Sequence, residues 1–261
     1  MSRRLAYLAE IGIPAYRLRR APAAPADAFV DSEVDAPPAA ATVGEAYAET
    51  SAPGAACFAA RDESRIVVAD GSAGTIDDAW SRLAAEVKDC RKCTLHRGRT
   101  QTVFGVGRRD AQLFVVGEAP GEEEDRQGEP FVGPAGRLLT AMLKAIGLAR
   151  QDVYIANILK CRPPGNRDPR PDEADACADY LNRQIALVKP KAMLAVGRIS
   201  AQRLLDTDLP VGRLRGVVHR YGDSAIPLVV TYHPAYLLRT PIAKAKSWQD
   251  LCMVLSLLRS A

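Results

Sequence analysis

The sequence predicts an α/β fold for residues 76–261, in which a four-stranded parallel sheet is covered by helices on both faces. Four short apolar runs have the composition of buried strands, and stretches with the apolar spacing of helices lie between them. Parallel strands need crossover connections, which are usually helices. The alternation therefore predicts a three-layer α/β/α domain.

The expected strands and helices are placed along the chain from these patterns. The strands are expected at residues 111–117, 152–158, 192–197 and 227–232. Helices are expected near residues 135–147, 172–188, 198–205 and 244–259. Ahead of the first strand, an apolar stripe at helical spacing predicts one more helix, formed by Ile76, Trp80, Leu83, Ala84 and Val87.

Residues 1–75 form a separate extension in this interpretation. Residues 21–60 are rich in alanine and proline and show no sustained apolar period, which predicts a poorly ordered linker. Residues 1–20 are rich in arginine and lack the apolar core of a secretory signal. They predict a short docking helix, with a transit peptide as the alternative. A protein partner of the extension is not identified by the sequence.

Charge is distributed unevenly between these two parts. Residues 1–75 carry 7 basic and 10 acidic side chains, whereas residues 76–261 carry 28 basic and 21 acidic ones. The positive surplus of the second part fits a polyanionic partner such as nucleic acid. No run approaches the roughly 20 apolar residues of a membrane span, so no membrane association is predicted.

The unusual chemistry of the chain follows the predicted strands. A glycine-rich, acidic loop at residues 117–136 follows the first strand, and Asn157 with the segment 160–167 follows the second. Gly197 follows the third strand, and His233 follows the fourth. Ligands of parallel α/β sheets bind beyond the carboxyl ends of the strands. These segments are therefore expected to share one edge of the sheet, where a ligand binds.

Four of the six cysteines have the pattern of a metal centre. Cys90 and Cys93 form a C-x-x-C pair, and Cys161 and Cys177 lie apart from it in the chain. Nothing suggests secretion, which argues against disulfides, and the pair precedes the first core strand, which argues against a thioredoxin-like redox site. By spacing alone, Zn²⁺ and an iron–sulfur cluster are both allowed. The two other cysteines, Cys57 and Cys252, are interpreted as inert thiols.

Four long motifs carry a resemblance to a known family. They read CRKCTLHRGRTQTVFGVG, VVGEAPGEEEDRQGEPFVGPAGRLL, YIANILKCRPPGNRDPRPDE and TYHPAYLLR. Together they resemble the family 4 uracil-DNA glycosylases, the iron–sulfur-containing bacterial and archaeal branch of the uracil-DNA glycosylase superfamily. The resemblance covers residues 76–261 in order and implies a three-layer fold with a four-stranded parallel sheet. It does not cover residues 1–75.

The resemblance also implies a cofactor, a cellular setting and an activity. It implies a [4Fe–4S] cluster, held by Cys90, Cys93, Cys161 and Cys177, and a monomer in the bacterial cytosol. The implied activity is hydrolysis of the bond between uracil and deoxyribose in DNA, which releases free uracil and leaves an abasic site. Because no lysine nucleophile is marked, the enzyme is expected to be monofunctional. Alternatives are a non-catalytic or product-trapping binder of uracil-containing DNA, and an electron-transfer iron–sulfur protein.

The resemblance assigns the uracil pocket to two segments. The enzyme must flip the nucleotide out of the duplex, and the side chain of Asn157 then matches the N3–H donor and O4 acceptor of uracil. Phe131 is expected to stack on the flipped ring. Gly117 and Gly121 are expected to let backbone amides approach the base closely. Ala119, in the same substrate-binding loop, stands where the best-known superfamily members carry an aspartate.

Three residues are assigned to catalysis. His233 is expected to donate a hydrogen bond to uracil O2, which becomes anionic as the glycosidic bond breaks. Glu118 and Asn166 are candidates for orienting the attacking water, and Glu118 alternatively excludes the C5 methyl group of thymine. The acids at residues 122–125 are interpreted as mostly solvated, with Glu123 or Glu124 near a helix start.

Two loops are expected to hold the DNA. Apolar side chains are expected to fill the gap left by the flipped base, and they are Tyr236, Leu237 and Leu238. Arginines are expected to bind phosphate groups, and they are Arg162, Arg167, Arg170 and Arg239.

Overall fold

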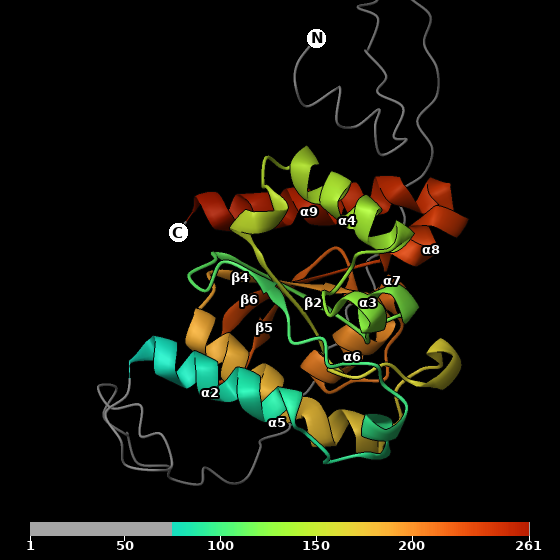
Figure 1. Ribbon diagram of the computed structural model, residues 1–261. Coiled ribbons are helices and arrows are strands. Elements are labelled where there is room, and N and C mark those ends of the chain that lie inside the picture. Colours follow the sequence, from blue (N-terminus) through green and yellow to red (C-terminus); the bar gives the residue numbers. More distant parts are fainter. Residues whose placement is uncertain (1–74, 261) are drawn as a thin grey trace, which may run out of the picture. The chain divides into compact units, whose positions relative to one another are not determined.

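The computed structural model describes residues 75–260, and it confirms the α/β class (Figure 1). One sheet of six strands runs through the domain in the order β1-β3-β2-β4-β6-β5. Its strands are β1 (Val106–Gly107), β2 (Leu113–Gly117), β3 (Tyr154–Asn157), β4 (Ala192–Val196), β5 (Val218–Tyr221) and β6 (Ile226–Thr231). The expectations for residues 1–74, including the docking helix and the linker, lie outside the described residues.

The sheet has two more strands than predicted. The four predicted strands are β2, β3, β4 and β6, and they pair in parallel as expected. The additional strands β1 and β5 pair antiparallel with β3 and β6 at the two edges. The strand β1 has only two residues, and β5 alternates exposed and half-buried positions. Neither forms the apolar run that identifies a buried strand.

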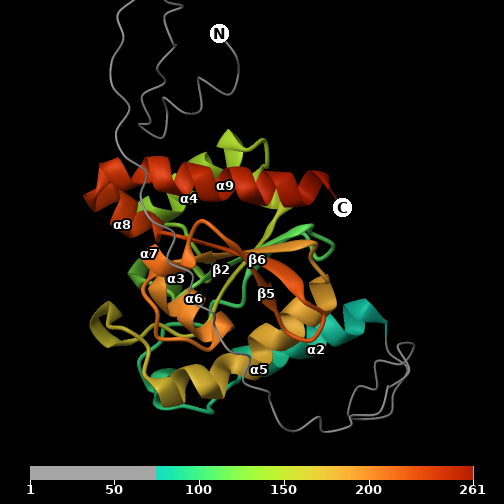
Figure 2. The same ribbon diagram turned by 180° about the vertical axis from the view of Figure 1, so that it is seen from behind.

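Helices cover both faces of the sheet, which gives the predicted three layers. In both views, α4, α8 and α9 lie on one side of the sheet, and α2 and α5 lie on the other (Figures 1 and 2). The predicted helices are α2 (Ile76–Lys88), α4 (Pro134–Ala145), α5 (Pro171–Val188), α6 (Arg198–Leu205) and α9 (Lys244–Arg259). Short helices that were not predicted are α3 (Glu122–Gln127), α7 (Val211–Leu214) and α8 (Pro234–Arg239). The 3₁₀ turns are η1 (Thr94–Arg97), η2 (Arg150–Asp152), η3 (Pro164–Asn166) and η4 (Pro241–Ala243).

Alternating residues of each central strand enter two separate cores. Along β2, Phe114 and Val116 pack with the helices α2 and α5, whereas Leu113 and Val115 pack with α4 and α9. This period of two is the geometry of a strand that is buried on both faces. All five residues of β2 and of β4 are buried, which explains why these strands read as continuous apolar runs. None of the helices in the described part of the chain is long and apolar enough to cross a membrane.

We expect Gly107→Ala to destabilise the domain. A Cβ atom at residue 107 would lie 1.8 Å from the carbonyl oxygen of Val153, and the φ angle of +127° disfavours any side chain. The combined strain should cost about 1–3 kcal/mol of unfolding free energy, measured by chemical denaturation. Gly98→Ala is the matched control, because its Cβ would contact nothing within 4 Å. Equal stability of the two variants would contradict this packing of β1 against β3.

Candidate active site

The candidate active site lies at the carboxyl edge of the parallel strands, as predicted. Gly117 and Asn157 are the last residues of β2 and β3 and stand opposite each other in the parallel register. Gly197 follows β4, and His233 follows β6 by two residues. The parallel order therefore brings segments that are far apart in sequence to one edge of the sheet.

Asn157 and Phe131 pack together over Gly117. A Cβ atom at residue 117 would lie 2.3 Å from Asn157 Oδ1 and 2.6 Å from the Phe131 ring. No side chain fits at residue 117 while both groups occupy these positions. Asn157 is 2% exposed, and its Oδ1 atom is buried without a hydrogen-bond partner. Such an unpaired buried acceptor is costly and marks a position that a ligand donor would satisfy.

The backbone at Phe131 is held in an unusual conformation. Its φ angle is +56°, in the left-handed region that residues with side chains seldom occupy. A Cβ atom at Gly136 would lie 1.8 Å from the Phe131 carbonyl oxygen, so glycine is required where α4 passes this turn. Arg150 donates to the carbonyl of the preceding residue, Pro130. These contacts hold the aromatic ring at the sheet edge, where strain of this kind is typical of functional sites.

Two of the four acids at residues 122–125 are structural, so the interpretation of the cluster as mostly solvated is wrong for them. Glu124 Oε1 accepts hydrogen bonds from the amides of Val132 and Gly133 at 2.9 and 3.1 Å, and its Oε2 accepts from Gly121 N at 3.1 Å. Asp125 is 3% exposed and accepts from Thr100 N. Acids in the first turn also suit the positive end of α3. In the sequence, Glu124 stands three residues after Gly121, which directly precedes α3. This spacing is typical of a side chain that accepts a hydrogen bond at a helix start.

This bonding changes the expectation for Gly121. Its amide is already engaged within the loop, where it donates to Glu124 Oε2. Ala119, in contrast, is half-buried and packs against the core on the α2 and α5 side.

His233 caps the N-terminus of α8 and faces Phe131. The ring centroids of Phe131 and His233 are 5.8 Å apart with an interplanar angle of 31°. A Cβ atom at Gly197 would lie 3.1 Å from His233 Cβ. Gly197, the residue after β4, therefore packs directly against the side chain of His233. Ala235 N donates to His233 Nδ1 at 3.2 Å, which makes Nδ1 the acceptor and leaves Nε2 to carry the proton.

Burial keeps His233 neutral. Desolvation and, to a smaller extent, the nearby positive charge of Arg239 lower the pKa of His233 to about 4, although the negative charge of Glu124 opposes them. The ring is therefore a neutral hydrogen-bond donor through Nε2 at physiological pH.

Glu118 has the opposite character. Burial and the negative charge of Asp168 together raise the pKa of Glu118 to about 7, although the positive charge of Arg198 opposes them. A carboxyl group with a pKa near the working pH is suited to general base catalysis. Asn166, the other candidate, lies on the exposed turn η3, where its Oδ1 accepts from Arg162 Nε at 2.8 Å.

The predicted phosphate-binding arginines differ in their surroundings. Arg167 forms a bidentate ion pair with Glu173, which is fully buried, at 2.6 and 2.9 Å. This pair fixes the start of α5, so the structure gives Arg167 a structural contact and not a free guanidinium. Arg162 is held by Asn166, whereas the side chains of Arg170 and Arg239 are exposed.

The predicted wedge is only partly exposed. Leu237 is 1% exposed and belongs to the core beneath α4 and α9, so its assignment to the wedge is wrong. Tyr236 and Leu238 are 37% and 46% exposed, which leaves them available as predicted. Ile242, on η4, is 85% exposed and was missed by the sequence analysis. Its signal in the sequence was an apolar residue directly after Pro241, between the basic residues Arg239 and Lys244.

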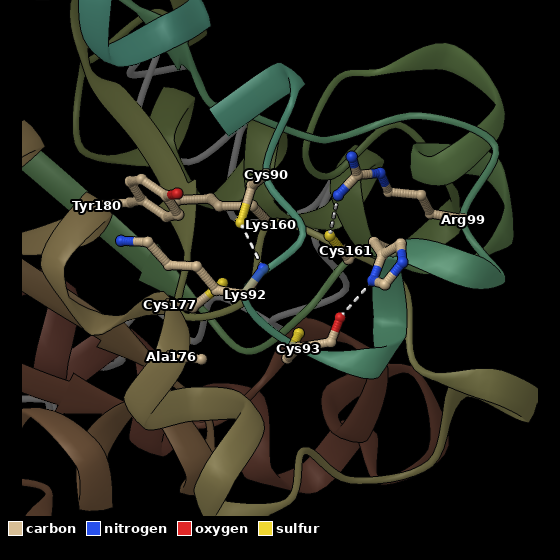
Figure 3. A pocket seen from close by; sticks show the side chains of 10 residues that line it. Cys90, Lys92, Cys93, Arg99, Lys160, Cys161, Ala176, Cys177 and Tyr180 are labelled. Atoms are coloured by element: carbon tan, nitrogen blue, oxygen red, sulfur yellow. Dashed lines mark hydrogen bonds between the residues drawn. The ribbon is translucent and has the colours of Figure 1, made fainter. Parts of the chain in front are cut away.

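Four cysteines line a single cavity on the α5 side of the sheet. The lining residues include Cys90, Cys93, Cys161 and Cys177, as Figure 3 shows. Within residues 75–260, no three metal-binding side chains converge closely enough to hold one metal ion. The thiols instead face a shared space from three segments of the chain.

The surroundings of this cavity suit a thiolate-bound group. Arg99 Nη1 donates to Cys161 Sγ at 3.1 Å, and the amide of Lys92 donates to Cys90 Sγ at 3.5 Å. Burial raises the pKa of Cys161, and it raises the pKa of Cys177 to about 11. Thiolates in so buried a place need positive charge near them. Four thiols around one cavity, with donors to the sulfur atoms, fit a cluster of several iron atoms.

One family model and several known proteins are similar to this chain. The family model of the uracil DNA glycosylase superfamily matches residues 104–252. A type-4 uracil-DNA glycosylase of Archaeoglobus fulgidus is 48% identical over 166 residues, covering 61% of this chain and 83% of that protein. Type-4 enzymes of Pyrobaculum aerophilum and Thermotoga maritima are each 42% identical, covering 66% and 63% of this chain and 91% and 86% of the relatives.

The neighbours Leu237 and Leu238 should respond differently to truncation. Leu237→Ala should lower the unfolding free energy by about 2–5 kcal/mol, because it removes a buried side chain. Leu238→Ala should change it by less than about 0.5 kcal/mol, because the side chain is exposed. Chemical denaturation measures both, and affinity for a DNA oligonucleotide measured on the same samples should fall for Leu238→Ala. Equal destabilisation by the two substitutions would contradict the placement of α8.

Proposed function

Because this chain belongs to the type-4 uracil-DNA glycosylases, a branch of the uracil-DNA glycosylase superfamily, we propose that it excises uracil from DNA. The protein is a DNA-repair hydrolase that acts on the N-glycosidic bond between the base and deoxyribose. The products are free uracil and an abasic site. The enzyme is monofunctional in this proposal, so it leaves the DNA strand intact.

The unpaired Oδ1 atom of Asn157 is the observation that carries this proposal. Uracil presents an N3–H donor beside an O4 acceptor, and one amide side chain complements both. The buried Oδ1 lacks a partner within the described protein and would accept from N3–H. Cytosine has an acceptor at N3, which would face Oδ1 and be repelled. A buried unpaired acceptor thus supports selection of uracil over cytosine.

Phe131 and His233 complete the pocket. An extruded base that stacks on Phe131 gains about 1–3 kcal/mol from base–aromatic contact. His233 lies beside that ring and presents Nε2–H as a donor. When the glycosidic bond breaks, negative charge develops on the uracil ring, and a donor aimed at O2 stabilises it as it forms. The low pKa of His233 keeps its imidazole neutral, so the ring stabilises the anion through a hydrogen bond and does not transfer a proton to the base.

Glu118 is proposed to act on the attacking water. Its carboxyl group sits directly after β2, next to Gly117, and has a pKa of about 7. As a carboxylate it would accept a proton from water and favour the positive charge that develops on the sugar. Asn166 does not orient the water in this proposal, because its side chain is engaged with Arg162 on the exposed turn.

We also propose that Cys90, Cys93, Cys161 and Cys177 hold a [4Fe–4S] cluster. When bound, the cluster supplies bonds that join the segment after α2 to the loop after β3 and to α5. Its role in this proposal is structural, since Asn157 ends β3, the strand that leads directly into the loop that carries Cys161. No catalytic step passes through it.

The remaining proposals concern DNA binding and cellular setting. Arg162, Arg170 and Arg239 bind phosphate groups, and Tyr236 and Leu238 enter the stack where the base is removed. Residues 76–261 form the glycosylase domain, and the protein acts as a monomer in the bacterial cytosol. The family assignment supports these proposals. The DNA-binding roles are also supported by the exposure of Arg170, Arg239, Tyr236 and Leu238.

Incubation with a labelled oligonucleotide that contains one uracil tests the function. The wild-type protein should release free uracil, and hot alkali should then cut the strand at the abasic site. Without alkali the strand should stay intact. Asn157→Ala should lower kcat/KM by roughly 10–100-fold, because a bidentate pair with a base contributes about 1–3 kcal/mol.

Asn182→Ala is the control for this substitution, since Asn182 is an exposed asparagine on α5 whose Oδ1 only accepts from Tyr221. It should retain wild-type activity. Iron content and visible absorption should confirm that each sample carries its cluster. A cluster-loaded wild-type protein that binds the oligonucleotide without releasing uracil would instead indicate a binder.

The pH dependence of kcat/KM separates the two titrating residues. Glu118 must lose its proton to act as a base, so kcat/KM should rise with pH and level off above about 7. His233 stays neutral throughout this range because its pKa is about 4. Glu118→Gln should remove the rise and lower the plateau. A wild-type profile that is flat between about pH 5 and 8 would leave Glu118 only the steric role against thymine.

A further inference from the structure

Lys160 is buried between Asn157, which is proposed to bind uracil, and the cysteine cavity. It is 1% exposed, although lysine is among the residues that are least often buried. Its Nζ atom donates to the main-chain carbonyl of Asn157 at 3.0 Å and to Gln184 Oε1 at 2.6 Å. Neither acceptor carries a formal charge. A lysine in such a place must have a structural or functional reason, because its burial is costly.

The position of the Lys160 amine is fixed by the groups behind it. Gln184 Nε2 donates to the carbonyl of Phe104 at 2.9 Å and lies 3.2 Å from Tyr154 Oη. With its amide nitrogen committed to these partners, Gln184 must present its oxygen to Lys160. The main-chain carbonyl of Lys160 in turn accepts from Val103 N at 2.8 Å. The amine can therefore serve as a fixed anchor.

The anchored group belongs to the residue that is proposed to recognise uracil. Asn157 ends β3, and the chain then turns, with Ile158 N donating to the carbonyl of Gly117. The Asn157 carbonyl is held by Lys160 at this turn. Holding that carbonyl fixes the peptide from which the Asn157 side chain projects. The unpaired Oδ1 of that side chain is buried against Gly117, where small shifts of the backbone would misplace it.

We propose that Lys160 is a positioning residue that holds Asn157 in the orientation required for binding uracil. This inference rests on the proposed function, because it assumes that Asn157 contacts the base. Lys160 does not contact the base itself. The Nζ atom donates to Asn157 in either protonation state, so the inference does not depend on the charge of Lys160.

Lys160 also lines the cysteine cavity and directly precedes Cys161 (Figure 3). The same side chain therefore borders both sites, and a substitution at residue 160 has to be checked for cluster content. A second variant is therefore needed that disturbs the position of the Lys160 amine without changing residue 160. Gln184→Leu withdraws the side-chain acceptor of Lys160 and leaves residue 160 unchanged.

The test compares two affinities of the cluster-loaded protein. Free uracil inhibits through the base pocket, whereas an oligonucleotide with an abasic-site analogue binds through its phosphates and needs no base contact. Lys160→Met should weaken inhibition by free uracil between about tenfold and a hundredfold, because misplacement of a recognition group has effects of this size. Affinity for the abasic oligonucleotide should stay within about twofold of the wild type.

Controls make each outcome decisive. Lys144→Met, on the exposed face of α4, should change neither affinity. If Lys160→Met loses the visible absorption of the cluster, Gln184→Leu replaces it in the test and should show the same selective loss of uracil inhibition. Gln184→Glu keeps an acceptor for Lys160, so inhibition by uracil should be much closer to the wild-type level than in Gln184→Leu. Uracil inhibition that stays at the wild-type level in the cluster-loaded variants would overturn the inference. Wild-type protein that releases no uracil would instead refute the proposed function.

Discussion

The packing of Asn157 and Phe131 over Gly117 is the constraint on which the site depends. These two side chains come from the end of β3 and from the turn before α4, and they meet only because residue 117 has no side chain. The parallel register places Gly117 opposite Asn157. The contact between Asn157 and Phe131 is thus a consequence of sheet geometry and one glycine.

The groups around this contact act as a rigid frame. Glu124 holds the amides after Phe131, Gly136 allows the close passage of α4, and Lys160 holds the Asn157 carbonyl. None of these three is proposed to touch the base. Pre-organisation of this kind lets a pocket bind a flipped base without first ordering its own loops, which is where much binding energy is otherwise lost. His233, which caps α8, places its ring beside that of Phe131, with 5.8 Å between the ring centroids.

Much of the fold could be predicted from the sequence because both core faces leave a periodic signal. The four parallel strands and five long helices lie where apolar spacing placed them. The edge strands β1 and β5 were missed because they are short or half-exposed and their pairing depends on neighbours. Leu237 was misassigned because a six-residue helix such as α8 gives too few turns to reveal its buried side. Arg167 could not be separated from Arg162 in sequence, since its partner Glu173 becomes buried only when α5 packs.

The most direct test of this account uses oligonucleotides that contain either uracil or N3-methyluracil. Methylation removes the N3–H donor and leaves the glycosidic bond and the ring face unchanged. The account predicts that wild-type kcat/KM falls by roughly 100-fold or more for the methylated base, since the buried Asn157 Oδ1 then stays unpaired. Asn157→Ala should process the two bases at similar rates. Equal processing of both by the wild-type enzyme would contradict the claim that this atom recognises uracil.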